Sequence, residues 1–151
     1  MGIEKDIQQV SFTSVHQKAM INLLYTYGWV IEKIRDFLAK EDITHQQFNI
    51  LRILRGSHPQ PLSTLQIRER MLDKMSDTSR IVDRLVVKGF VKKTPCSKDK
   101  RLVDVLITEK GQRLLKKLDA EADHIAEVMG KLTDEEADQL SNLLDKLRNA
   151  G

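Results

Sequence analysis

The sequence has little of what secreted and membrane-bound proteins require. It contains one cysteine, which rules out an internal disulfide framework and favours a reducing compartment. No apolar run approaches the roughly 18 residues that a membrane-spanning helix needs. The N-terminal stretch MGIEKDIQQ carries acids and glutamines where a signal peptide has a basic flank and an apolar block. We therefore expect a cytoplasmic protein with no membrane partner.

Signatures of catalysis and of metal or cofactor binding are also missing. The four histidines are scattered along the chain, without a helical i, i+4 pair and without a cluster around the cysteine. The sequence has no Gly-rich phosphate loop, no nucleophile elbow and no neighbouring Ser/His/Asp set. It therefore predicts neither an enzyme nor a metal or cofactor site.

What is present is the composition of a folded protein, with an uneven distribution of charge. With 151 residues, 40% hydrophobic and 31% charged, the chain is long enough for one core, in one domain or two closely fused pieces. The net charge is +1 over residues 1–65, +6 over 66–101 and −4 over 102–151. A basic centre between such flanks is typical of a module that binds a polyanion. A solvated charged surface is the plainer alternative.

Helical periodicity predicts long helices at both ends of the chain and shorter ones between them. Capping boxes mark some of the starts, with Gln or Glu at the third position after Thr44, Ser63 and Thr133. After the fourth helix the apolar period changes to two, which predicts strands over 90–94 and 102–107 around a polar tip. The predicted helices cover residues 16–40, 44–56, 63–72, 76–88, 108–130 and 133–147.

The helix over 76–88 carries most of the functional signal. Only residues 73–75 separate it from the preceding helix, which makes the two a helix-turn-helix candidate. Ser76 is its N-cap candidate, Asp77 suits the helix dipole, and Gly89 ends it. The apolar face comprises Ile81, Val82, Leu85 and Val86, and the polar face comprises Thr78, Ser79, Arg80, Asp83, Arg84 and Lys88.

The first helix and the last two have apolar stripes broader than the central module can cover. We expect them to pack together and against the same helices of a second copy; a monomer with a closed helical cap is the alternative. Aromatic side chains and one cation in the first two helices suggest a ligand pocket, although packing explains the aromatics equally well. The candidate pocket residues are Tyr25, Tyr27, Trp29, Phe48 and Arg52.

Several short motifs, in this order, resemble those of the MarR family of bacterial transcription regulators, over residues 15–148. No single motif decides the resemblance, but their order and spacing together support it. The matching motifs are Thr44, Gln47, Phe48, Leu51 and Leu54 in the second helix, residues 79–85 (SRIVDRL) and 88–91 (KGFV), the wing triplet Asp99, Lys100 and Arg101, and residues 106–111 (LITEKG).

The resemblance implies a mainly α fold with a small β-hairpin wing. A winged helix-turn-helix domain over 41–108, with its wing at about 90–107, is then flanked by dimerisation helices in 1–40 and 109–151. It also implies a homodimer on a pseudo-palindromic operator, with recognition helices in successive major grooves and wings in the flanking minor grooves. Family ligands, often small phenolic or aromatic anions, bind between the dimer helices and the winged helix.

Side-chain chemistry assigns contacts within this arrangement. Arg80 and Arg84 are candidates for bidentate bonds to guanine edges or to phosphates, and an internal ion pair is the alternative for Arg84. Asp77 either accepts from a cytosine amino group or serves the helix dipole, and we favour the dipole. The recognition-helix candidates are Ser76, Asp77, Thr78, Ser79, Arg80, Arg84 and Lys88, and the phosphate-contact candidates are Ser63 and Thr64.

At the wing, Arg101 is the candidate for insertion into a narrow A·T-rich minor groove. The resemblance implies that Asp99 braces it through a salt bridge, while Lys98 and Lys100 attract phosphates. A solvated charged turn is the alternative. Cys96 lies in the same tip, where the lysines favour its thiolate. A redox switch is one hypothesis for this thiol, and a bystander is the favoured one.

Together these patterns favour a homodimeric DNA-binding transcription regulator. We expect a repressor rather than an activator, because a bound dimer most simply excludes polymerase. A helical dimeric adaptor that keeps the fold and binds protein is the alternative, and a redox-responsive regulator using Cys96 is a third. The Lys/Arg excess over 66–101 favours DNA, since an adaptor has no need of it. The expected partners are double-stranded DNA, a second copy and a small aromatic or phenolic effector.

Overall fold

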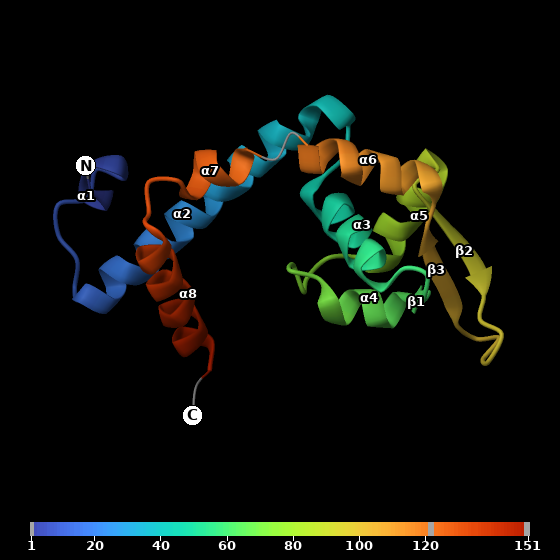
Figure 1. Cartoon of the computed structure of the whole chain (residues 1–151). Coiled ribbons are helices and arrows are strands. Elements are labelled where there is room, and N and C mark those ends of the chain that lie inside the picture. The colour runs from blue at the N-terminus through green and yellow to red at the C-terminus, as the bar shows by residue number, and fades with distance from the viewer. Residues whose placement is uncertain (1, 121–122, 150–151) are drawn as a thin grey trace.

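The computed structural model describes residues 2–120 and 123–149, which form a head and an extended arm (Figure 1). The elements are α1 (Ile3–Asp6), α2 (Val15–Leu38), the 3-10 turn η1 (Ala39–Glu41), α3 (His45–Ser57), β1 (Leu62–Ser63), α4 (Thr64–Arg70), α5 (Thr78–Lys88), β2 (Val91–Pro95), β3 (Val103–Ile107), α6 (Glu109–Ala120), α7 (His124–Met129) and α8 (Asp134–Arg148). The head contains α3 to α6 and the strands, and the arm contains α1, most of α2, α7 and α8. In the described ranges no helix has the length and apolar character needed to cross a membrane.

The three predicted capping boxes are confirmed, and they fix the starts of α3, α4 and α8. The Thr44 hydroxyl accepts the Gln47 N–H at 3.1 Å, and the Gln47 side chain accepts the Thr44 N–H in return. Ser63 and Gln66 form the same reciprocal pair at the start of α4. Thr133 opens α8 in the same way. A cap of this kind contributes about 1 kcal/mol to helix stability.

The core lies in the head, where short helices pack around one face of the sheet. Periodicity placed Val82 and Leu85 on the buried face of α5 correctly, since both are fully enclosed, whereas Val86, which we also placed there, is 37% exposed. The last turn of α2 also enters this core through Leu38, which joins the arm to the head. The largest fully buried side chains are Leu38, Ile50, Leu51, Leu54, Ile67, Leu85, Leu115, Leu118, Val82 and Val105.

The predicted hairpin is confirmed, and the structure adds a third strand to it. β2 and β3 pair antiparallel, with Val91 opposite Ile107 at the base. β1 pairs with the other edge of β3, placing Leu62 opposite Val105 and giving the strand order β1-β3-β2. The strand β1 was not predicted, because two residues show no detectable alternation. The wing is therefore anchored to the residues that open α4.

The N-cap of α5 is Asp77, so the prediction of Ser76 for this position is wrong. The Asp77 carboxylate accepts the N–H of Arg80 at 3.3 Å, and α5 begins at Thr78. A carboxylate is as good a cap as a hydroxyl and adds a charge that suits the helix dipole. This bond supports the helix-dipole role that we favoured for Asp77. At the other end Gly89 adopts φ 81°, the left-handed conformation expected after the last helical residue.

The link between α4 and α5 covers residues 71–77 and is longer than predicted. Met71 turns its backbone to an extended conformation and buries its side chain, so the helix ends at the residue before it. The N–H of Leu72 then donates to the side-chain oxygen of Asn49 on α3 at 2.9 Å. Leu65 and Leu72, both within the predicted helix over 63–72, are 60% and 88% exposed. Packing of Met71 and the Asn49 bond therefore override the helical pattern.

The helices of the arm follow the predicted outline, with differences at the ends. α2 begins at Val15 because Ser14 caps it by accepting the N–H of Gln17 at 3.0 Å. The short helix α1 was not predicted. The continuous helix expected over 108–130 is present as α6 and α7, and residues 121–122 between them lie outside the described part of the chain.

Gly111 in the first turn of α6 has no room for a side chain. A Cβ there would lie 2.4 Å from the carbonyl oxygen of Phe90 and 2.8 Å from Cγ1 of Ile107. We expect Gly111→Ala to destabilise the head by about 1–3 kcal/mol, because overpacking against backbone outweighs the better helix propensity of alanine. Gly28→Ala in α2 is the matched control, since nothing lies within 4 Å of that position. Thermal unfolding should show a lower Tm for the first variant and an unchanged or higher Tm for the second.

Candidate nucleic-acid interface

The outer face of α5 presents two guanidinium groups that no described residue neutralises. Arg80 and Arg84 are exposed one turn apart, on the side opposite Val82. Neither forms an ion pair with a described residue. Asp83, the acid that precedes Arg84, binds Lys93 of β2 with an Oδ1–Nζ distance of 2.6 Å. Both arginines thus keep their donors available for an external acceptor.

Two residues that we assigned to this polar face do not lie on it. Thr78 is 4% exposed, because it lies one helical turn before Val82 and shares its buried face. The ammonium of Lys88 donates to Oε1 of Gln47 at 3.1 Å and to the carbonyl of Asp42, which ties the end of α5 to the start of α3. The side chains facing outward from the first two turns are therefore those of Ser79, Arg80, Asp83 and Arg84.

The wing tip holds Arg101 in a fixed fork with Asp99, which confirms the predicted brace. Nε and Nη2 of Arg101 donate to the two carboxylate oxygens of Asp99, each at 3.1 Å, and the backbone N–H of Arg101 donates at 3.0 Å. These bonds hold the pKa of Asp99 below its usual value and raise the pKa of Arg101 further. The Arg101 side chain is nevertheless 89% exposed, so its remaining donors point to solvent.

The wing also carries lysine side chains outside the fork of Arg101 and Asp99. Lys92, Lys98 and Lys100 are exposed, and no described carboxylate pairs with them. Cys96 is half-buried in the tip as a free thiol, and its N–H donates to the carbonyl of Leu102 at 3.0 Å. The wing therefore combines one oriented guanidinium with several exposed, unpaired cations, which is suited to a polyanion.

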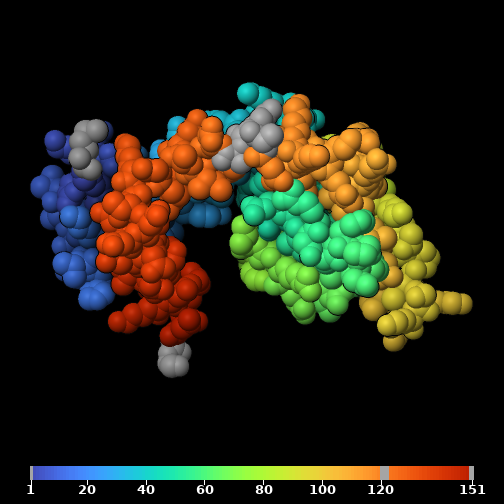
Figure 2. All heavy atoms as spheres, in the orientation of Figure 1, coloured from blue at the N-terminus to red at the C-terminus, as the bar shows by residue number. Residues whose placement is uncertain are grey.

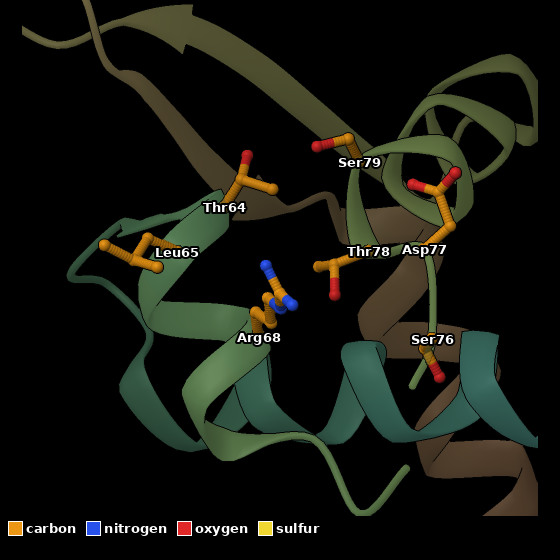
Figure 3. A pocket seen from close by; sticks show the side chains of 7 residues that line it. All are labelled: Thr64, Leu65, Arg68, Ser76, Asp77, Thr78 and Ser79. Atoms are coloured by element: carbon orange, nitrogen blue, oxygen red, sulfur yellow. The ribbon is translucent and has the colours of Figure 1, made fainter. Parts of the chain in front are cut away.

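The first turn of α4 faces the first turn of α5 across a hollow of about 420 Å³ (Figure 3). Ser63 uses its hydroxyl oxygen and its N–H for the capping box, whereas the Thr64 hydroxyl forms no bond with a described residue. Arg68 also lines the hollow, and we missed it in the sequence although it lies one turn after Thr64. Its spacing was a usable signal, because residues four apart share a helix face. The residues lining the hollow are Thr64, Leu65, Arg68, Ser76, Asp77, Thr78 and Ser79.

The predicted aromatic pocket is not assembled within one chain. Tyr25 and Trp29 project from α2 as exposed side chains, while the guanidinium of Arg52 lies 5.6 Å from the ring centroid of Phe48 on α3. A different cavity of about 710 Å³ lies where the end of α2, the start of α3 and the end of α5 meet. It is lined by Arg35, Ala39, Asp42, Ile43, Thr44, His45, Gln46, Gln47, Arg84, Val87 and Lys88.

The chain has a helix-turn-helix whose second helix carries two unpaired arginines, and a β-hairpin wing whose arginine is held by Asp99. These features define a winged helix-turn-helix protein of the DNA-binding class. A model of the MarR family matches residues 43–103. The HTH-type transcriptional repressor MdtR of Bacillus subtilis (strain 168) is 31% identical over 116 residues, which cover 75% of this chain and 72% of MdtR. The uncharacterized regulator YkoM of the same organism is 28% identical over 145 residues, 93% of each chain.

The fold comparison agrees with the sequence comparison. A mutant MarR from E. coli, in a crystal structure with operator DNA, superposes with a TM-score of 0.78 at 25% identity, covering 91% of this chain and 99% of that one. The chain described here belongs to the MarR family. It is a DNA-binding transcription regulator and not an enzyme, as the resemblance in the sequence predicted.

Proposed function

We propose that the chain is a repressor that binds a pseudo-palindromic operator as a homodimer. The observation that carries this proposal is the pair of unpartnered arginines on α5, together with the fork of Arg101 and Asp99 on the wing. The first pair suits the major groove, where guanidinium groups bind guanine edges, and the fork suits a narrow minor groove. A repressor is the simplest reading because an occupied operator excludes polymerase.

The arm supports the homodimer, because many of its large apolar side chains are exposed in one chain. Figure 2 shows α8 standing apart from α3 and α4 across open space. Exposed apolar patches of this extent usually mark an interface. The large exposed apolar side chains of α2, α7 and α8 are Val15, Met20, Leu23, Leu24, Tyr25, Tyr27, Trp29, Ile125, Leu140, Leu143 and Leu147.

Selection of bound sites from random duplex DNA tests operator and dimer together. We expect a two-fold symmetric consensus whose half-sites lie about 10 base pairs apart, one turn of the double helix. Affinity for the selected site should fall steeply with added salt, since each phosphate contact releases counterions. The rival function is a dimeric adaptor that binds protein. No enrichment, or binding that is indifferent to salt, would support the adaptor and exclude the operator.

We further propose that a small aromatic anion releases the operator. The cavity of about 710 Å³ suits such a ligand, since Arg35, Arg84 and Lys88 offer cations beside apolar atoms of Ile43 and Val87. Burial lowers the pKa of His45 in the same cavity, which favours its uncharged ring. A ligand there contacts the last turn of α5 and competes for the Lys88 bonds that hold this turn.

Titration with salicylate, a small phenolic acid, distinguishes this cavity from the predicted aromatic pocket. If the cavity is the site, salicylate should weaken operator binding by the parent, and Arg35→Gln should reduce the response. Trp29 is the one tryptophan of the sequence, and its fluorescence should stay unchanged. Strong quenching of Trp29 with an unaltered response in Arg35→Gln would place the ligand at the aromatic cluster instead.

A further inference from the structure

The hollow between α4 and α5 gathers hydrogen-bond donors that have no acceptor. In Figure 3 the guanidinium of Arg68 extends from α4 into the hollow, toward the side chain of Thr78 on α5. Arg68 forms no ion pair with a described carboxylate. The N–H groups of Thr78 and Ser79, in the first turn of α5, donate to no described acceptor. These donors come from both helices of the helix-turn-helix, and the residues that carry them line one hollow.

A second observation distinguishes the hollow from an ordinary helix start. The Thr78 side chain is 4% exposed, and its hydroxyl has no hydrogen-bond partner among the described residues. The Ser76 hydroxyl is also buried without a partner. Buried polar groups are normally satisfied, so the unpaired Thr78 hydroxyl, toward which the unpaired guanidinium of Arg68 extends, indicates a site that lacks its acceptor. The one carboxylate of the lining, Asp77, is engaged as the N-cap through the Arg80 N–H.

We propose that this hollow binds one phosphate of the DNA backbone and that Arg68 is its principal ligand. A guanidinium presents two parallel N–H groups that match two phosphate oxygens, and the N-terminus of α5 adds backbone donors and a positive dipole end. The proposal rests on DNA binding by this chain, and it assigns Arg68 a role separate from the candidate base readers Arg80 and Arg84.

The position of the hollow favours a phosphodiester over free phosphate. A backbone phosphate carries a single negative charge. Inorganic phosphate carries more, so the Asp77 carboxylate, which lines the hollow, repels it more strongly. The hollow also opens beside the outward face of α5, where Ser79 and Arg80 begin the candidate major-groove surface. One phosphate held by α4 and α5 together would fix the depth at which the first turn of α5 enters the groove.

The first test compares Arg68→Gln with Arg70→Gln in the full-length protein. Arg70 is an exposed arginine on the same helix that does not line the hollow, so it controls for the loss of one charge. We expect Arg68→Gln to weaken binding by about tenfold on operator and random duplex alike, and to lower the salt slope by about 1. Arg68→Lys should restore the salt slope but not the full affinity, because an ammonium lacks the fork.

The second test replaces single backbone phosphates of the operator with uncharged methylphosphonates. At one position in each half-site, the methylphosphonate should weaken operator binding by the parent. At the same position it should not weaken binding by Arg68→Gln any further, since the two changes remove one interaction. Equal sensitivity of both proteins at every position would overturn the proposal. So would competition by inorganic phosphate, at constant ionic strength, that inhibits the parent more than Arg68→Gln, because it would make the hollow a site for a free anion.

Two further outcomes separate this inference from the proposed function. If the parent binds the operator with a steep salt dependence and Arg68→Gln has the same affinity and salt slope, the phosphate site is wrong and the proposed function stands. A parent that binds no duplex contradicts both. Thermal unfolding of each variant shows whether a loss of binding comes from a loss of the fold, and we expect unchanged midpoints because Arg68 is exposed.

Discussion

Leu143→Glu should convert the protein to a monomer and remove most of its operator affinity. Leu143 is 64% exposed on α8, in the apolar stripe that the proposed dimer covers. A carboxylate buried in that interface would have no partner, which disfavours association strongly. A monomer has one head instead of two. Its affinity for the operator should be lower by a factor on the order of 10²–10⁴, because the second head no longer binds at a high effective concentration. Light scattering after gel filtration and fluorescence anisotropy measure the two effects.

Gln139→Glu is the control for this experiment. It adds the same charge to the same helix at an exposed position that neighbours the apolar stripe, and it changes almost no volume, so it tests the charge without removing an apolar contact. We expect a dimer with nearly parental affinity. If Leu143→Glu remained dimeric and bound the operator like the control, the interface would lie elsewhere on the molecule. If the parent itself were a monomer that bound operator tightly, the homodimer would be wrong.

Arg101→Ala should lower operator affinity by about 1–3 kcal/mol, with the largest loss on sites whose flanks are A·T-rich. The Arg101 guanidinium is held by Asp99 yet exposed, so it needs little reorganisation to enter a narrow groove. Lys98→Ala removes a cation from the same tip and is the matched control. It should weaken all duplexes modestly and leave the preference for A·T-rich flanks intact. Equal losses on A·T-rich and G·C-rich flanks for Arg101→Ala would contradict the minor-groove assignment.

Asp99→Asn separates the brace from simple charge. If Asp99 acted only as a negative charge near DNA, its removal would strengthen binding. If orientation of Arg101 matters, the same change should weaken binding, because the amide keeps one acceptor and loses the two-pronged carboxylate. The fork also holds the pKa of Asp99 low. The brace should therefore persist as pH falls through the range in which an aspartate ordinarily titrates, and be lost only below that range.

Local signals with a physical cause predicted much of this molecule from its sequence. Thr44, Ser63 and Thr133 predicted helix starts because a capping box needs only residues three apart. The hairpin followed from the change of period, and the brace between Asp99 and Arg101 followed from a family resemblance. These features depend on neighbours along the chain, which is why they could be predicted without coordinates.

The predictions that failed, or were not made, depend on contacts between distant segments. Lys88 was assigned to the polar face of α5, and nothing local shows that Gln47 and the Asp42 carbonyl would capture it. The link before α5 is long because Asn49 of α3 binds the Leu72 N–H. Arg68 acquired significance only when α4 and α5 were seen to share a hollow. Thr78 was the avoidable error, since helical spacing from Val82 already placed it inside.

The pairing of β1 with β3 has a consequence for the motions of the wing. Because β3 lies between two strands, its amides should exchange with solvent more slowly than those of β2, which has a free edge. Leu62 joins this sheet one residue before the cap of α4, so opening the base of the wing must also disturb the start of that helix. Hydrogen exchange should therefore report the wing base and the start of α4 as one cooperative unit. The tip between Pro95 and Val103 should open independently.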